Sequence, residues 1–122
     1  MAHEEFSECI DECNACAEEC EHCADACLSE QHVAQMAECI RLDRDCADLC
    51  RLAVALMSRG SRFAARACEL CAIACDECAR ECEKHEAEHC QACAEACRRC
   101  ADACRNMKTS GVSAGAASAA AH

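Results

Sequence analysis

The sequence contains no proline, tryptophan or tyrosine, and only 3 glycines and 2 phenylalanines occur among its 122 residues. Proline and glycine interrupt helices and form turns, so their scarcity favours long helices. Aromatic residues, which strands favour, are nearly absent, so a β-sheet is not expected. The length suits one domain. These absences predict a small all-α protein.

Basic residues are also few. The chain has 12 Lys and Arg against 23 Asp and Glu, and its net charge is −11. Because nucleic-acid binding needs a basic surface, we expect no nucleic-acid partner. An acidic surface ordinarily keeps a protein soluble, and a weak attraction for cations is the alternative explanation.

Long apolar runs are missing as well. No stretch approaches 18 apolar residues, so no membrane span is expected. The acidic start MAHEEFSECIDEC has no apolar region of the kind found in secretory signals. We therefore expect a cytoplasmic location, where thiols stay reduced and a cysteine-rich pattern indicates metal binding or catalysis before disulfides.

The sequence is instead rich in cysteine, with 19 residues that recur at helical spacing. Between Cys9 and Cys27, successive cysteines are 4, 3, 4, 3 and 4 residues apart. A helix advances 3.6 residues per turn, so these thiols share the face on which leucine or isoleucine normally fills a bundle seam. The pattern recurs at 68–82 and 90–104, and in diluted form at 32–57.

These rows of inward-facing positions predict four helices. Three of them lie at about 4–28, 33–58 and 62–84, and the fourth runs from a turn near 85–88 to Met107. Gly60 suits the position after a helix end, and Ser61 suits an N-cap. The turn near 85–88 rests on a slip of register, because the third helix predicts an inward residue at 89 but the next cysteine is Cys90. Four such helices predict an antiparallel up-down-up-down bundle with a cysteine-lined core in residues 1–108. Residues 109–122 are a low-complexity tail outside it.

The second helix departs from the pattern in two ways. Asp43 occupies an inward position, which suggests a structural role, although it could bind metal or rotate outward towards Arg44. The helix also carries extra apolar residues, which either pack within the monomer or form a subunit interface. They are Ile40, Leu42, Leu49, Leu52, Val54 and Leu56.

A seam made of thiols indicates metal binding rather than packing or disulfides. Cysteine is a poor filler for a helix seam, and the odd number of cysteines prevents complete pairing within the chain. Neighbouring Cβ atoms on a helix lie about 5–6 Å apart, whereas a disulfide needs about 3.8 Å. Two sulfurs on opposite sides of one metal ion lie about 4.5 Å apart, which cysteines four residues apart can reach.

Charge selects the metal. A Zn²⁺ ion with four thiolates carries a net charge of −2, and several such sites along one buried axis would be costly. Iron–sulfur clusters usually draw cysteines from loops, often followed by proline. Cu(I) is soft, prefers thiolates and balances bridging thiolates about one to one, which predicts multiple bound ions, roughly 19 per chain. A zinc buffer and a thiol–disulfide redox protein are the alternatives, although redox cysteines usually lie at a helix N-terminus.

The expected metal ligands are therefore all the cysteines: Cys9, Cys13, Cys16, Cys20, Cys23, Cys27, Cys39, Cys46, Cys50, Cys68, Cys71, Cys75, Cys78, Cys82, Cys90, Cys93, Cys97, Cys100 and Cys104. Up-down topology gathers soft or basic side chains at one end of the bundle, where we expect metal to enter: His32, Met36, His85 and His89. His22 is expected on the flank of a seam. The opposite end collects a predicted apolar plug: Phe6, Met57, Phe63 and Met107.

Three segments, CNACAEECEHCADAC (13–27), CIRLDRDCADLC (39–50) and EHCQACAEACRRCADAC (88–104), resemble the copper storage proteins, in particular their leaderless cytosolic branch. The resemblance covers roughly residues 8–107. It implies a four-helix bundle whose core cysteines bind Cu(I) and which assembles as a homotetramer. We therefore expect a cytosolic store or buffer of Cu(I), without catalysis, that exchanges copper with donor or acceptor proteins. In that case, the extra apolar face of the second helix would serve assembly.

Overall fold

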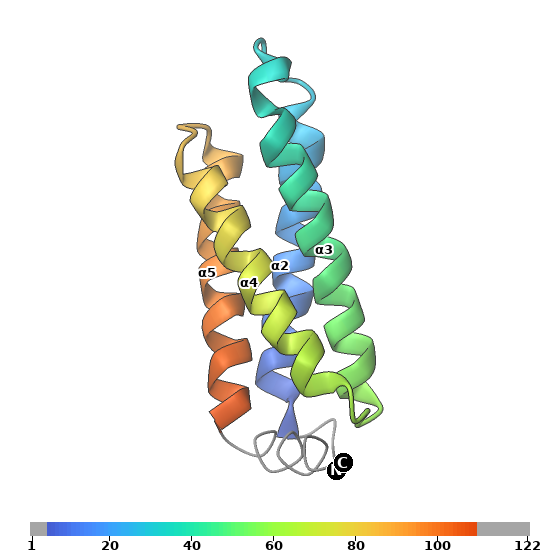
Figure 1. Cartoon of the computed structure of the whole chain (residues 1–122). Coiled ribbons are helices and arrows are strands. Elements are labelled where there is room, and N and C mark those ends of the chain that lie inside the picture. The colour runs from blue at the N-terminus through green and yellow to red at the C-terminus, as the bar shows by residue number, and fades with distance from the viewer. Residues whose placement is uncertain (1–4, 110–122) are drawn as a thin grey trace.

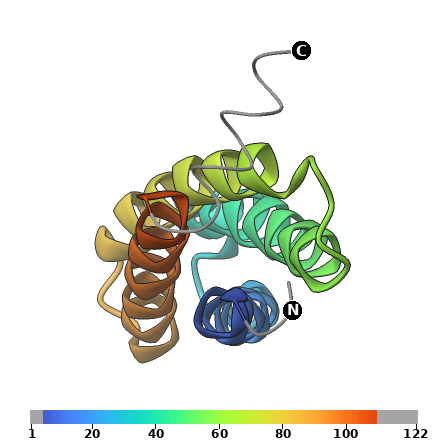
Figure 2. The ribbon, with the colours of Figure 1, turned by 90° about the horizontal axis from the view of Figure 1, so that it is seen from below.

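A computed structural model gives the fold and describes residues 5–109. It contains four long helices, α2 (Ser7–Cys27), α3 (Ala37–Ser58), α4 (Ala64–Glu83) and α5 (Glu88–Thr109), and no strand in the described part. Each helix packs against two others, so that α2, α3, α4 and α5 follow one another around a single axis (Figures 1 and 2). The prediction of an all-α antiparallel four-helix bundle is confirmed. Residues 110–122 of the predicted tail lie outside the described residues.

The turn between α3 and α4 is a Schellman motif. Gly60 has a φ of 62°, a left-handed value that glycine adopts without steric cost. The Gly60 amide donates to the Met57 carbonyl at 3.1 Å, and the Ser61 amide donates to the Leu56 carbonyl at 2.9 Å. Gly60 therefore ends α3 as predicted.

Ser61 lies two residues before the N-cap of α4, which is Phe63 rather than the predicted Ser61. The Ser61 Oγ accepts a hydrogen bond from the Phe63 amide at 3.1 Å.

The other two connections share what we call the upper end of the bundle, which carries residues 28–36 and 84–87 (Figure 1). The predicted break near 85–88 is confirmed, since α4 ends at Glu83 and α5 begins at Glu88. The second helix was expected to start near 33, but Val33–Met36 form a 3₁₀-helix, η1, before α3. Such tighter turns are common at helix starts. The end opposite, with the α3–α4 turn, is the lower end.

The thiols set the register of neighbouring helices. Along α2 and α5, Cys9 lies 3.7 Å from Cys104 and Cys13 lies 3.5 Å from Cys100, measured between Sγ atoms. The ladder continues with three further Sγ–Sγ contacts between α2 and α5: Cys16 with Cys97, Cys20 with Cys93, and Cys23 with Cys90. The helices α3 and α4 form a second ladder of thiols, with the following Sγ–Sγ pairs: Cys39 with Cys82 at 3.6 Å, Cys46 with Cys75 at 3.5 Å, and Cys50 with Cys71 at 3.6 Å.

Most of the extra apolar residues of α3 pack within the monomer, which is one of the two expected roles. Ile40, Leu42, Val54 and Leu56 pack partly against the core. Leu52 remains 47% exposed, and on α4 Leu70 and Ile73 are 49% and 60% exposed. Much of the α3 face therefore packs within the monomer, while Leu52 stays on the surface. None of the described helices combines the length and the apolar character that crossing a bilayer requires.

Candidate metal centre

All 19 cysteines are buried, and all are free thiols. Alanines fill most of the remaining core positions, so helices approach closely enough for thiols on different helices to meet. The direct Sγ–Sγ contacts between neighbouring helices include one of 3.5 Å, between Cys46 and Cys75, and one of 4.0 Å, between Cys27 and Cys39. The core is therefore one continuous column of sulfur rather than a set of separate sites.

Within this column the thiols form four-membered cages whose sulfurs all lie within 4.8 Å of one another. Four of the cages share no residue, so they divide most of the column into successive levels. From the lower to the upper end, they are Cys13–Cys71–Cys100–Cys104, Cys16–Cys46–Cys50–Cys75, Cys20–Cys78–Cys93–Cys97 and Cys23–Cys27–Cys39–Cys90. A metal–sulfur bond of about 2.3 Å places the sulfurs of a trigonal ion about 4.0 Å apart and those of a tetrahedral ion about 3.8 Å apart. The cages are thus close to metal-binding geometry before any ion binds.

Asp43 takes the place of a cysteine in the α3–α4 ladder. It is fully buried, and its Oδ1 accepts S–H contacts from Cys78 at 3.1 Å and Cys93 at 3.3 Å. Cys82 contacts the same oxygen at 3.6 Å, and Cys39 contacts Oδ2 at 3.8 Å. The inward position predicted from the helix register is confirmed, and rotation towards Arg44 is excluded.

Burial favours the protonated form of three groups in the upper half of the core. Removal from water, together with the neighbouring Cys93 and Cys39, raises the pKa of Asp43 to about 9. Removal from water is also the main reason that the pKa of Cys90 rises to about 12 and that the pKa of Cys27 rises. At neutral pH these groups therefore hold their protons in the metal-free bundle, and a bound cation must displace them.

At the upper end, one histidine reaches the thiols. His89 points its Nδ1 at Cys23, Cys90 and Cys27, at 3.4, 3.5 and 4.0 Å from their Sγ atoms. Its Nε2 lies 2.8 Å from Glu30 Oε2. The sequence did not indicate this role for Glu30, because Glu30 lies in a connection with no periodicity and its partner is 59 residues away.

The other predicted residues of the upper end lie in different surroundings. His85 Nε2 lies 3.0 Å from Glu81 Oε2, and Met36 is buried against the core. His32 is exposed at the start of η1. His22 is exposed beside the seam, as predicted, on a surface hollow lined by Glu19, His22, Glu88, His89 and Ala92. The expected cluster is therefore spread out, and of its histidines His89 is the one placed against the thiols.

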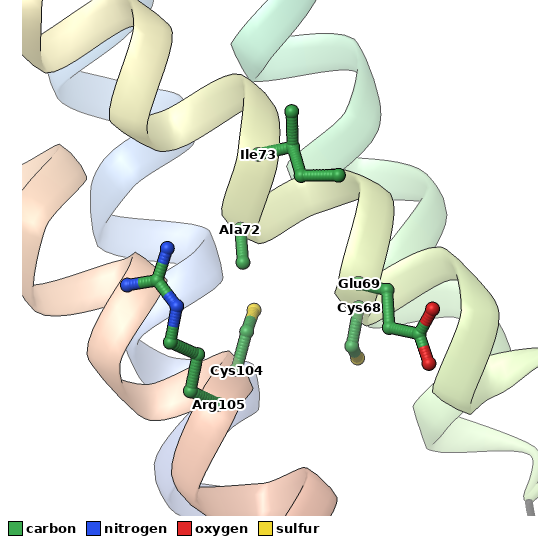
Figure 3. A pocket seen from close by; sticks show the side chains of 6 residues that line it. All are labelled: Cys68, Glu69, Ala72, Ile73, Cys104 and Arg105. Carbon is green, nitrogen blue, oxygen red and sulfur yellow. The ribbon is translucent and has the colours of Figure 1, made fainter.

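Three of the four predicted plug residues are buried at the lower end. Phe6, Met57 and Met107 are buried. Phe63 is 55% exposed, with the Arg62 guanidinium 5.1 Å from its ring centroid, so its predicted place in the plug is wrong. The reason is that the N-terminal turn of α4 directs Ala64 and Ala65 inward instead. Nearby, a hollow between α4 and α5 brings Cys68 and Cys104 close to the surface beside Arg105 (Figure 3).

A closed bundle whose interior consists of free thiols at metal-ligand spacing defines a class of protein, the polythiol metal-binding bundles. Comparison with known proteins identifies the group within that class. The copper storage protein family matches residues 2–109, so the chain belongs to the copper storage protein family.

Solved structures of relatives have the same fold. The Cu(I)-bound copper storage protein BsCsp3 is 47% identical, with a TM-score of 0.80 over 88% of this chain and 98% of that one. A cytosolic copper storage protein from Streptomyces lividans, loaded with five coppers, is 44% identical, with a TM-score of 0.83 over 87% of this chain and 93% of that one. The uncharacterized cysteine-rich protein YhjQ of Bacillus subtilis is 50% identical over 61 residues, which span 49% of this chain and 56% of that protein.

Proposed function

We propose that this protein stores Cu(I) in its core, with all 19 cysteines as ligands. The observation that carries the proposal is the column of buried free thiols, in which direct Sγ–Sγ contacts of 3.5 to 4.0 Å join neighbouring helices and the cage sulfurs lie within 4.8 Å of one another. A thiolate that bridges two Cu(I) ions fits such spacing, because trigonal Cu(I) needs sulfurs about 4.0 Å apart. The relatives described as Cu(I)-bound or copper-loaded support the choice of metal.

Charge balance sets the capacity. Each Cu(I) that replaces a thiol proton leaves the core charge unchanged, so the column can fill without accumulating charge in a medium of low dielectric constant. The expected content is therefore roughly one Cu(I) per thiol, or about 19 per chain. Buried ions held by several thiolates would be withheld from adventitious chemistry, and the role is storage without catalysis.

Copper would enter at the upper end, where His32, Met36, His85 and His89 were predicted to guide it. His89 is the best placed, since it contacts three thiols and borders the surface hollow that contains His22. Neutral imidazole is a suitable transient ligand for a soft ion. The buried Phe6, Met57 and Met107 would close the lower end.

The cellular setting is proposed from the relatives. One of them is described as cytosolic, and we propose the same location for this protein. We also propose that the protein forms homotetramers, in which the exposed Leu52, Leu70 and Ile73 would be covered, and that it exchanges copper with donor and acceptor proteins. The copper-binding domain would be residues 1–108, and the tail at 109–122 would take no part.

A parallel metal titration tests the function. Fully reduced protein is titrated with Cu(I) in the presence of a chromophoric chelator that competes for the ion, and separately with Zn²⁺. Storage predicts tight uptake near one Cu(I) per thiol and a rise in melting temperature as the ion binds. Saturation at four or five Zn²⁺, about one for every four thiols, with weak Cu(I) binding would indicate a zinc buffer. Reduction of disulfide substrates without metal uptake would indicate a redox protein.

A further inference from the structure

One group of side chains at the upper end differs from the rest of the core in its chemistry. The four cages named above consist of thiols, but Cys23, Cys27 and Cys90 also have an imidazole as a neighbour. The three thiols are fully buried, whereas the His89 side chain is 13% exposed. The group therefore lies at the border between the core and solvent.

The distances fit a tetrahedral ion with three sulfur ligands and one nitrogen ligand. Zn²⁺ binds thiolate at about 2.3 Å and imidazole at about 2.0–2.1 Å, which places the sulfurs about 3.8 Å apart and the nitrogen about 3.5 Å from each sulfur. Here Cys23 Sγ lies 3.9 Å from both Cys27 Sγ and Cys90 Sγ. His89 Nδ1 lies 3.4, 3.5 and 4.0 Å from the three sulfurs.

Glu30 prepares His89 to act as a ligand. Its carboxylate lies 2.8 Å from Nε2, where it accepts the N–H of the ring. In the neutral imidazole this leaves the lone pair on Nδ1, the atom directed at the thiols. A carboxylate that accepts the distal N–H of a ligating histidine is the usual second partner in zinc sites, where it fixes the tautomer and the ring orientation.

Charge favours this group over an all-thiol cage for a divalent ion. Three thiolates and a neutral imidazole leave a net charge of −1 on bound Zn²⁺, whereas four thiolates leave −2. Cys39, the fourth thiol of this cage, also contacts Asp43 at 3.8 Å and Cys82 at 3.6 Å, so it belongs to the α3–α4 ladder as well. Deeper cages lie farther from solvent and would bury the larger charge, which is costly.

We propose that Cys23, Cys27, Cys90 and His89 form a binding site for one Zn²⁺ ion, with Glu30 as the residue that positions His89. The site shares its three thiols with the copper store, and it differs from that store in the ion that it takes in the copper-free protein and in its stoichiometry of one per chain. The test of this proposal does not depend on copper storage, because Zn²⁺ binding is measured in the absence of copper.

Co²⁺ serves as the spectroscopic probe. One equivalent is added to the reduced, metal-free protein under anaerobic conditions. The expected result is the strong visible absorption of tetrahedral Co²⁺ with thiolate-to-cobalt charge transfer, abolished when Zn²⁺ is added. X-ray absorption of the protein with one Zn²⁺ should show three sulfurs and one nitrogen. Weak octahedral absorption, or four sulfurs around zinc, would overturn the proposal.

Variants assign the residues. His89→Ala should weaken binding of the first ion by at least 10-fold, and Glu30→Gln, which alters a half-exposed side chain, should weaken it by about 10–100-fold. His22→Ala is the matched control, because His22 is an exposed histidine of α2 that is not one of the proposed ligands, and its loss should leave the affinity unchanged. Equal affinity in the wild type and His89→Ala would overturn the proposal, as would equal losses in His22→Ala and His89→Ala. Far-ultraviolet circular dichroism of each variant separates these effects from unfolding.

Discussion

Asp43 gives the metal-free bundle a stability that depends on pH, and replacing it with asparagine should remove that dependence. The carboxyl group is fully buried among thiols, and its pKa rises from an ordinary 3.8 to about 9, chiefly because burial penalises the charged form. The Asp43→Asn substitution would keep the size of the side chain and an oxygen that accepts from Cys78 and Cys93. The amide cannot ionise, so the substitution isolates the titration of this one group.

The sign follows from the protons bound in each state. Between pH 3.8 and 9 the folded protein holds the Asp43 proton and the unfolded chain does not, so folding becomes less favourable as pH rises. The contribution is fully present below pH 3.8 and is lost up to pH 9. Each pH unit in this window costs about 1.4 kcal/mol. Raising the pH from about 5 to about 7 should therefore destabilise the wild type by about 3 kcal/mol relative to Asp43→Asn.

Urea unfolding of the reduced, metal-free proteins at about pH 5, 6 and 7, followed by circular dichroism, measures this difference. Other carboxylates titrate equally in both proteins and cancel. Asp45→Asn on the same helix is the control, because Asp45 is exposed and its substitution should leave the pH dependence as in the wild type. A constant difference in free energy between the wild type and Asp43→Asn across this range would show that Asp43 is ionised in the folded protein.

Two further predictions concern the turn and the copper route. Gly60→Ala should lower the free energy of unfolding by about 1–2 kcal/mol, because the φ of 62° at this position would place the alanine Cβ against the backbone. Arg59→Ala is the control, because Arg59 has a φ of −103° and its replacement should change the free energy of unfolding little. Equal urea midpoints for the two variants would contradict the requirement for glycine at position 60. In stopped-flow measurements of Cu(I) uptake, His89→Ala should load more slowly than His32→Ala, because His89 contacts thiols while His32 is exposed. Identical rates for wild type and His89→Ala would remove His89 from the route.

The helices and the inward faces could be predicted from the sequence because both follow from one repeating property. Cysteines spaced three and four residues apart define a face, and a chain with few glycines and no proline leaves few places for a turn. The slip of register between His85 and Cys90 located a turn that lacks glycine and proline. Phe63 was misplaced because the sequence shows apolar character but not the direction of a helix start, and the first inward positions of α4 belong to Ala64 and Ala65.

The chemistry of the upper end could not be predicted in the same way, because it depends on contacts between segments without periodicity. His32, His85 and His89 are equivalent in a sequence, since all three lie near turns that share one end. The structure separates them by their partners: Glu81 engages His85 near the end of α4, whereas Glu30 reaches across from another connection and leaves Nδ1 of His89 facing the thiols. Both His85 and His89 have a carboxylate partner on Nε2, so the position of His89 Nδ1 against the thiols decides which histidine can act as a ligand. The same reasoning applies to Asp43, whose position follows from the register but whose raised pKa follows from burial among thiols that α4 and α5 supply.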